Sequence, residues 1–127
     1  MRLLIDTNRM TDLLRGNPAV ARVAEHAREM WVPFVTVAEV KAGFAWGNRA
    51  TANQVHFDAA MRVPGVSTLF ADSETVEVYA RLVAQLRRSG TQIPTNDLWI
   101  ASLAVQHGLT VFSRDKHFSR LPQLEIV

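Results

Sequence analysis

The chain has 127 residues, of which 48% are hydrophobic and 20% charged, values typical of a globular protein of one domain. It contains no cysteine, which excludes disulfides, thiolate metal sites and cysteine nucleophiles. A net charge of +2 does not by itself indicate a nucleic-acid ligand, although twelve of the fourteen basic residues are arginine, which suits phosphate contacts. No signal peptide is recognisable, and no apolar run approaches the ~20 residues that cross a bilayer, so we expect a cytoplasmic protein without a membrane segment.

Strands and helices are predicted to alternate along the chain. The first strand, Leu3–Ile5, is an aliphatic run typical of a strand covered on both faces. Further strands are expected at 31–35, 66–70 and 109–112, with a short last strand at 124–127. Helices are expected at 8–15, 18–27, 36–47, 48–62, 73–89 and 97–107.

Two helix starts carry sequence signals of their own. Asn17 followed by Pro18 is typical of a cap and a first helical position. Thr36-Val37-Ala38-Glu39 has the form of a capping box. The alternation predicts an α/β fold, a single three-layer domain over residues 1–127 with a parallel sheet of four to five strands flanked by helices.

Four acidic residues occupy related places in this predicted fold. Asp6 ends the first strand, Asp115 follows the strand at 109–112, and Glu39 lies in the first turn of a predicted helix. We expect these three at the carboxyl edge of the sheet, where open α/β sheets bind their ligands. Asp97 lies in the first turn of the helix before the fourth strand, and it joins them only if that helix begins at the same edge.

Each acid also has a purely local interpretation. Asp6 could cap the following helix, and Glu39 could complete the capping box with Thr36. Asp97 could favour its helix dipole, and Asp115 could hydrogen-bond its own backbone in a turn. These alternatives stay open at the level of the sequence.

Carboxylates gathered in one pocket raise one another's pKa, and a hard divalent cation relieves the repulsion by replacing protons. Mg²⁺ is the expected occupant because it prefers oxygen ligands and is often bound by one or two carboxylates together with substrate phosphate. Such an ion activates water and neutralises charge on a phosphoryl oxygen. The pattern therefore favours hydrolysis of a phosphodiester.

The order of the motifs resembles that of the PIN-domain ribonucleases, and more narrowly that of the VapC toxins of toxin–antitoxin operons. The resemblance covers essentially the whole chain and is most specific over 93–118. The motifs are Asp6-Thr7-Asn8, Glu39 with Gly43, Asn96-Asp97, and Ser113-Arg114-Asp115.

The resemblance implies a metal-binding, catalytic quartet of Asp6, Glu39, Asp97 and Asp115. It also implies supporting roles for the polar side chains of Thr7, Asn8 and Ser113. The cofactor would be Mg²⁺, or Mn²⁺, and the substrate RNA, with tRNA or rRNA as candidates. Members of this family are usually homodimers held inactive by a VapB antitoxin, so both features are expected here.

Three further residues have competing interpretations. Arg9 stands where the family more often has an apolar residue, and we expect it on the surface rather than at a phosphate. Trp46 is expected to meet the antitoxin. His117 is expected to be structural or solvent-facing rather than an acid–base group.

Two rival functions remain at this level. One is a PIN nuclease of RNA processing without an antitoxin, distinguished by the absence of an upstream antitoxin reading frame. The other is a non-catalytic module whose acids bind a cation or a basic partner.

Overall fold

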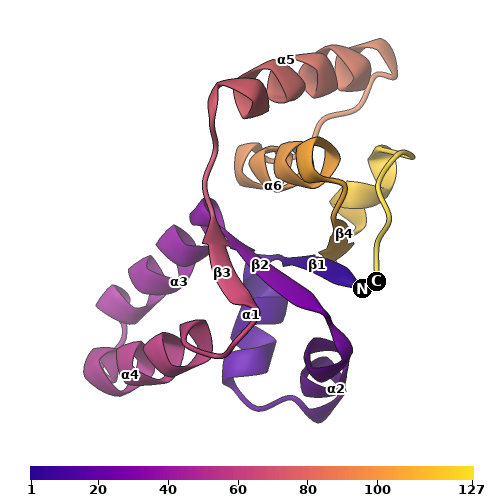
Figure 1. The fold of residues 1–127 in the computed structure, drawn as a ribbon. Helices are drawn as coiled ribbons and strands as arrows, with labels where there is room; N and C mark the ends of the chain where they lie inside the picture. The colour runs from indigo at the N-terminus through magenta and orange to yellow at the C-terminus, as the bar shows by residue number, and fades with distance from the viewer.

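Four parallel strands form one sheet in the order β3-β2-β1-β4 in the computed structural model, which describes residues 1–127 (Figure 1). β1 is central and pairs with β2 through Leu3 and Met30, and with β4 through Leu3 and Thr110. The strands are β1 (Arg2–Ile5), β2 (Glu29–Pro33), β3 (Val66–Leu69) and β4 (Thr110–Phe112). The fold is α/β, as the alternation predicted.

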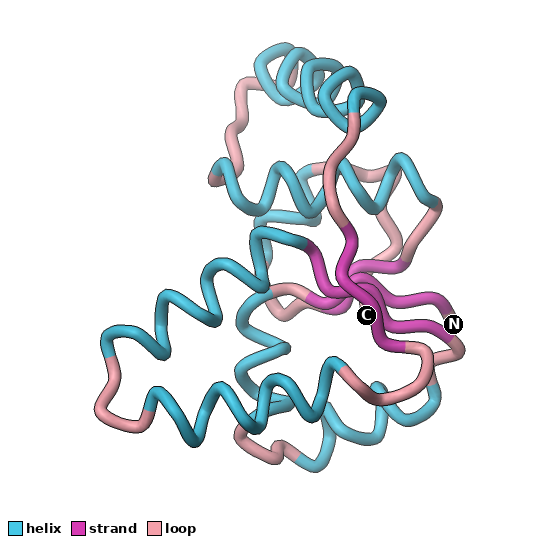
Figure 2. Tube along the Cα trace, turned by 60° about the vertical axis from the view of Figure 1, so that its left-hand side comes forward, coloured by secondary structure: helices cyan, strands magenta, loops and turns pink.

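Pairs of helices connect consecutive strands. They are α1 (Thr7–Leu14), α2 (Pro18–His26), α3 (Phe34–Trp46), α4 (Ala50–Met61), α5 (Ser73–Arg88) and α6 (Thr95–His107), and the 3₁₀ helix η1 (Lys116–Arg120) follows β4. α3 and α4 lie side by side and extend beyond the sheet (Figures 1 and 2). None of these helices combines the length and the apolar character needed to cross a membrane.

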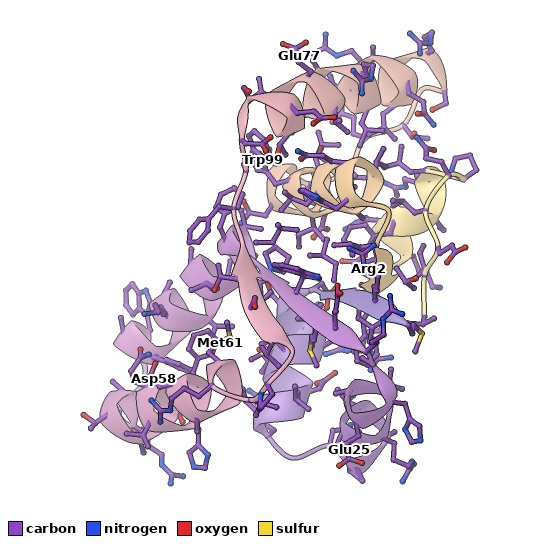
Figure 3. All side chains as sticks on the ribbon, in the orientation of Figure 1. Arg2, Glu25, Asp58, Met61, Glu77 and Trp99 are labelled. Atoms are coloured by element: carbon purple, nitrogen blue, oxygen red, sulfur yellow. The ribbon has the colours of Figure 1, made fainter.

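The alternation of side chains along β1 divides the core into two parts. Leu4 packs with buried residues of α5, α6 and η1 on one face of the sheet. Leu3 and Ile5 pack on the other face with residues of α1, α2 and α4. On the first face Trp99 of α6, labelled in Figure 3, packs against Tyr79 of α5, with ring centroids 4.3 Å apart and ring planes tilted by 32°. Both faces of the sheet are covered, which explains the continuous aliphatic run of β1.

Local sequence signals account for several helix ends. The side chain of Asn17 accepts hydrogen bonds from the backbone of Ala19 and Val20 at the start of α2, as predicted. α6 ends at Gly108, whose φ of +65° is a left-handed conformation that glycine adopts without steric cost.

Two predicted boundaries are wrong. α3 begins at Phe34, with Pro33 as its cap, so Thr36 lies inside the helix and forms no capping box. Pro33 ends β2, and its extended backbone turns the chain into the helix two residues early. The last strand predicted at 124–127 is present only as an isolated parallel bridge between Ile126 and Val111.

Candidate active site

A cleft of about 480 Å³ opens at the carboxyl edge of the sheet, and no hydrophobic side chain lines it. Its lining residues are Asp6, Thr7, Asn8, Glu39, Pro94, Thr95, Asn96, Asp97, Asp115 and His117. All four acids singled out in the sequence therefore face one space. Asp97 belongs to this group because α6 starts at Thr95, at the same edge as the ends of β1 and β4.

Asp6 is the most deeply buried of the four, with 3% of its surface exposed. One carboxylate oxygen, Oδ1, accepts the backbone N–H of Arg9 at 2.9 Å and so caps α1, while Oδ2 accepts the hydroxyl proton of Ser113. Burial raises the pKa of Asp6, and these two hydrogen bonds partly offset the rise. Asp6 therefore caps α1, as its local interpretation predicted, and also lines the cleft.

Ser113 connects two of the acids. Its hydroxyl donates to Asp6, and its oxygen also accepts the backbone N–H of Asp115 at 2.9 Å. Asp115 in turn caps η1 through the N–H of His117, also at 2.9 Å. The segment after β4 is thereby fixed to the end of β1.

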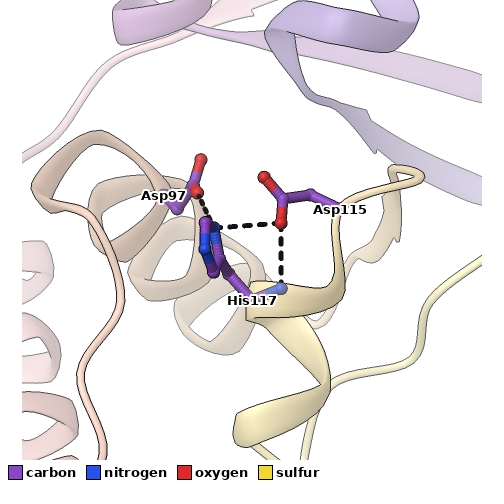
Figure 4. Close-up of side chains that lie close together, drawn as sticks. All are labelled: Asp97, Asp115 and His117. Atoms are coloured by element: carbon purple, nitrogen blue, oxygen red, sulfur yellow. Dashed lines mark hydrogen bonds and ion pairs between the residues drawn. The ribbon is translucent and has the colours of Figure 1, made fainter.

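Asp97 and Asp115 share a histidine ring (Figure 4). The Nδ1 atom of His117 lies 3.0 Å from Oδ2 of Asp97 and 2.9 Å from Oδ1 of Asp115. Burial raises the pKa of Asp97, the neighbouring charges of Asp115 and Glu39 raise it further, and the hydrogen bond from His117 opposes them.

Glu39 reaches the cleft from the second turn of α3, one turn later than predicted, because the helix begins at Phe34. The hydroxyl of Thr7 donates to its Oε1 at 2.8 Å. Thr36, fully buried, lies beside Thr7 with the two hydroxyl oxygens 3.3 Å apart, and donates to the carbonyl of Ile5. Asn8 also lines the cleft, and its side chain forms no hydrogen bond within the protein.

The donor set fits a divalent cation. Carboxylate oxygens of Asp97 and Asp115 and Nδ1 of His117 all lie within 4.8 Å of one another, and Asp6 and Glu39 line the same cleft. Oxygen-rich ligand sets of this kind suit Mg²⁺ and Mn²⁺ rather than soft metals.

Two residues make contacts that the sequence did not predict. His117 was expected to be structural or solvent-facing rather than an acid–base group, and its ring, 35% exposed, contacts two of the acids; its position two residues after Asp115, at a turn, was the available signal. Arg9 was expected on the surface, but its guanidinium packs over the ring of Phe112, with Cζ 5.3 Å from the centroid, and pairs with Asp12 at 3.4 Å. Its Nε atom is buried without a partner.

Comparison with known proteins places this chain in a family. The family model for the PIN domain matches residues 3–124. The chain is 32% identical to ribonuclease VapC4 of Mycobacterium tuberculosis over 102 residues, which are 78% of this chain and 76% of the relative. It is 30% identical to the VapC ribonuclease Y4jK of Sinorhizobium fredii over 98% of this chain and 95% of the relative.

The fold is shared with solved toxin–antitoxin structures. The crystal structure of VapBC2 from Rickettsia felis, bound to a DNA fragment from its promoter, matches 100% of this chain and 98% of that chain, with a TM-score of 0.86 and 21% identity. The chain thus belongs to the PIN-domain family and, within it, to the VapC group.

Proposed function

We propose that this chain is a metal-dependent endoribonuclease and the toxin of a VapBC-type toxin–antitoxin system, acting in the cytoplasm, with residues 1–127 as one PIN domain. One observation carries the proposal: four carboxylates converge on a cleft that no hydrophobic side chain lines. The names of the VapC ribonucleases that the chain resembles support the same activity.

The catalytic and metal-binding residues in this proposal are Asp6, Glu39, Asp97 and Asp115, with Mg²⁺ as the cofactor and Mn²⁺ as a substitute. When bound, the cation supplies a water of lowered pKa and neutralises the charge that develops on the phosphoryl oxygens. Hydrolysis then needs no covalent intermediate with the protein.

Hydrogen bonds from neighbouring residues orient two of the carboxylates. Ser113 and the backbone of Arg9 fix both oxygens of Asp6, so the most buried carboxylate has a single orientation. Thr7 fixes Glu39 through a hydrogen bond of 2.8 Å. Such outer hydrogen bonds preserve the geometry of the metal ligands. Their removal typically lowers metal affinity or activity about 10–100-fold.

His117 has a separate part in the proposal. Its ring contacts Asp97 and Asp115 together and holds the two carboxylates, which repel each other, at a fixed separation. The polar side chain of Asn8 lines the same cleft and is free to hydrogen-bond water or substrate. The cleft thus offers negative charge and a few hydrogen-bonding groups to its ligand.

A VapB-like antitoxin and a second copy of this chain are the proposed protein partners. Solved structures that share the fold include a toxin–antitoxin complex from Klebsiella pneumoniae and a member of the VapBC family of toxin–antitoxin systems from Mycobacterium tuberculosis, which supports the antitoxin. Trp46 at the end of α3, 94% exposed, is the proposed contact for the antitoxin.

Incubation of the purified chain with total cellular RNA tests the activity. Discrete fragments are expected with Mg²⁺ or Mn²⁺ and none with EDTA, and co-purified product of an adjacent upstream reading frame should suppress the cleavage. If the folded chain cuts no RNA with either metal, the nuclease proposal is refuted and a cation- or partner-binding module takes its place. Cleavage that no upstream product suppresses would instead indicate an RNA-processing nuclease.

A further inference from the structure

A second hollow of about 480 Å³ lies next to the acidic cleft, between α1, α3 and α4. Thr7 and Glu39, which are hydrogen-bonded to each other, line both spaces, so the hollow adjoins the cleft at this pair. We call this second space the α1–α4 groove. Several of its lining residues lie on α3 and α4. These are the two helices that extend beyond the sheet (Figures 1 and 2).

The sign of the charge reverses from the cleft to the groove. Arg15, Arg49 and His56 line the groove, and Glu39, at the junction, is its one acid. Arg15 at the end of α1 and Arg49 at the start of α4 are exposed and take part in none of the ion pairs of the chain. Their guanidinium groups are therefore free to form paired hydrogen bonds with an anion.

The other residues that line the groove offer apolar and polar surface in addition to the basic groups. Leu14, Val40 and the half-buried ring of Phe44 contribute apolar surface to the groove, and Asn53 contributes a polar group. Grooves for single-stranded nucleic acid combine basic residues that follow the backbone with apolar or aromatic surface against the bases. An RNA strand whose phosphodiester lies at the acids has to leave the cleft, and this groove adjoins the cleft and carries the opposite charge.

We propose that the α1–α4 groove binds the RNA strand on one side of the cleaved bond, with Arg15 and Arg49 contacting its phosphates and His56 offering a further ring nitrogen. The proposal rests on the proposed ribonuclease function, and it names the part of the substrate that the acids do not hold. It makes single-stranded RNA several nucleotides long, rather than an isolated phosphodiester, the preferred substrate.

The test is the salt dependence of RNA binding. A fluorescein-labelled, random-sequence single-stranded RNA of 20 nucleotides is titrated with the wild type, with R15A/R49A, and with the control R81A/R88A by fluorescence anisotropy. The control removes two exposed, unpaired arginines from α5, on the other side of the sheet. Cleavage during the titration is prevented with Ca²⁺ in place of Mg²⁺, or at low temperature.

R15A/R49A is expected to weaken binding about tenfold and to reduce the slope of log K against log salt by about 1.4, since each phosphate contact to a single strand contributes about 0.7. R81A/R88A should leave both unchanged. Equal slopes for R15A/R49A and the wild type would overturn the proposal, whether or not RNA is cleaved, and would leave the groove to a protein ligand. Absence of both binding and cleavage by the wild type would instead refute the nuclease function itself.

Discussion

Removal of the Ser113 hydroxyl gives a prediction that the structure makes quantitative. Ser113 is 5% exposed, donates to the carboxylate of Asp6 and accepts the N–H of Asp115. Ser113→Ala removes both hydrogen bonds, so the buried carboxylate of Asp6 loses a donor and the backbone N–H of Asp115 loses its acceptor. A hydrogen bond to a charged group contributes about 1.5–3 kcal/mol, so we expect a loss of about 2–3 kcal/mol in the free energy of unfolding near pH 8.

The same change should cost less in acid. Burial already raises the pKa of Asp6, and the hydrogen bond from Ser113 restrains that rise. A carboxyl group whose pKa is raised on folding contributes stability below its ordinary pKa and loses it as the pH rises through the folded value. Ser113→Ala raises that pKa further, so the destabilisation grows with pH, from about 1 kcal/mol near pH 4 to the full amount near pH 8.

Urea unfolding at the two pH values measures both quantities, and a Tm decrease of about 8–12 °C near pH 8 accompanies them. Ser102→Ala is the matched control, because Ser102 is also fully buried but donates to a neutral carbonyl, that of Leu98, at 2.7 Å. Its destabilisation should not depend on pH. A loss for Ser113→Ala that is equal at both pH values would refute the reasoning about Asp6.

Three further predictions concern the cleft and its partners. Asp97→Asn should raise the Tm of the metal-free protein at neutral pH, because burial raises the pKa of Asp97 and its ionised form therefore destabilises the fold. In the same thermal scan, Mg²⁺ should raise the Tm of the wild type and not that of the variant. Thr7→Val removes the donor to Glu39 and should lower the RNA cleavage rate about tenfold with little change in Tm, and an unchanged rate would show that Glu39 needs no such support. Trp46→Ser should leave Tm and RNA cleavage unchanged, because the side chain is 94% exposed, and should weaken the antitoxin complex at least tenfold by calorimetry; equal affinity would place the antitoxin elsewhere.

The sequence predicted the sheet because β1 is marked by an aliphatic run and the other strands by short apolar segments that alternate with helix signals. Asp6 and Asp115 follow their strands within a few residues, so their edge of the sheet is determined by strand direction alone. The position of Asp97 depends on how α5 and α6 cross back over the sheet, which no local pattern encodes. Only the resemblance to a family supplied that position at the sequence level.

Three further features that the sequence did not predict have identifiable physical causes. The start of α3 depends on the backbone of Pro33, which competes successfully with the capping signal of Thr36. The contacts of His117 depend on the turn of η1, which directs its ring back to Asp97, 20 residues away in the chain. Arg9 is drawn inward by the ring of Phe112, a residue distant in sequence. The start of α3 thus depends on an adjacent residue, whereas the contacts of His117 and Arg9 depend on residues distant in the sequence.

The most direct test of the central claim is the initial rate of cleavage of one defined RNA fragment at saturating Mg²⁺ by the wild type, Asp97→Asn and Glu77→Gln. Glu77 lies on the outer side of α5, exposed and far from the cleft, so its substitution controls for the loss of one negative charge (Figure 3). We predict that Asp97→Asn lowers the rate about 100-fold or more and that Glu77→Gln stays within about twofold of the wild type. Cleavage by Asp97→Asn at the wild-type rate would contradict the assignment of the acidic cleft as the nuclease site.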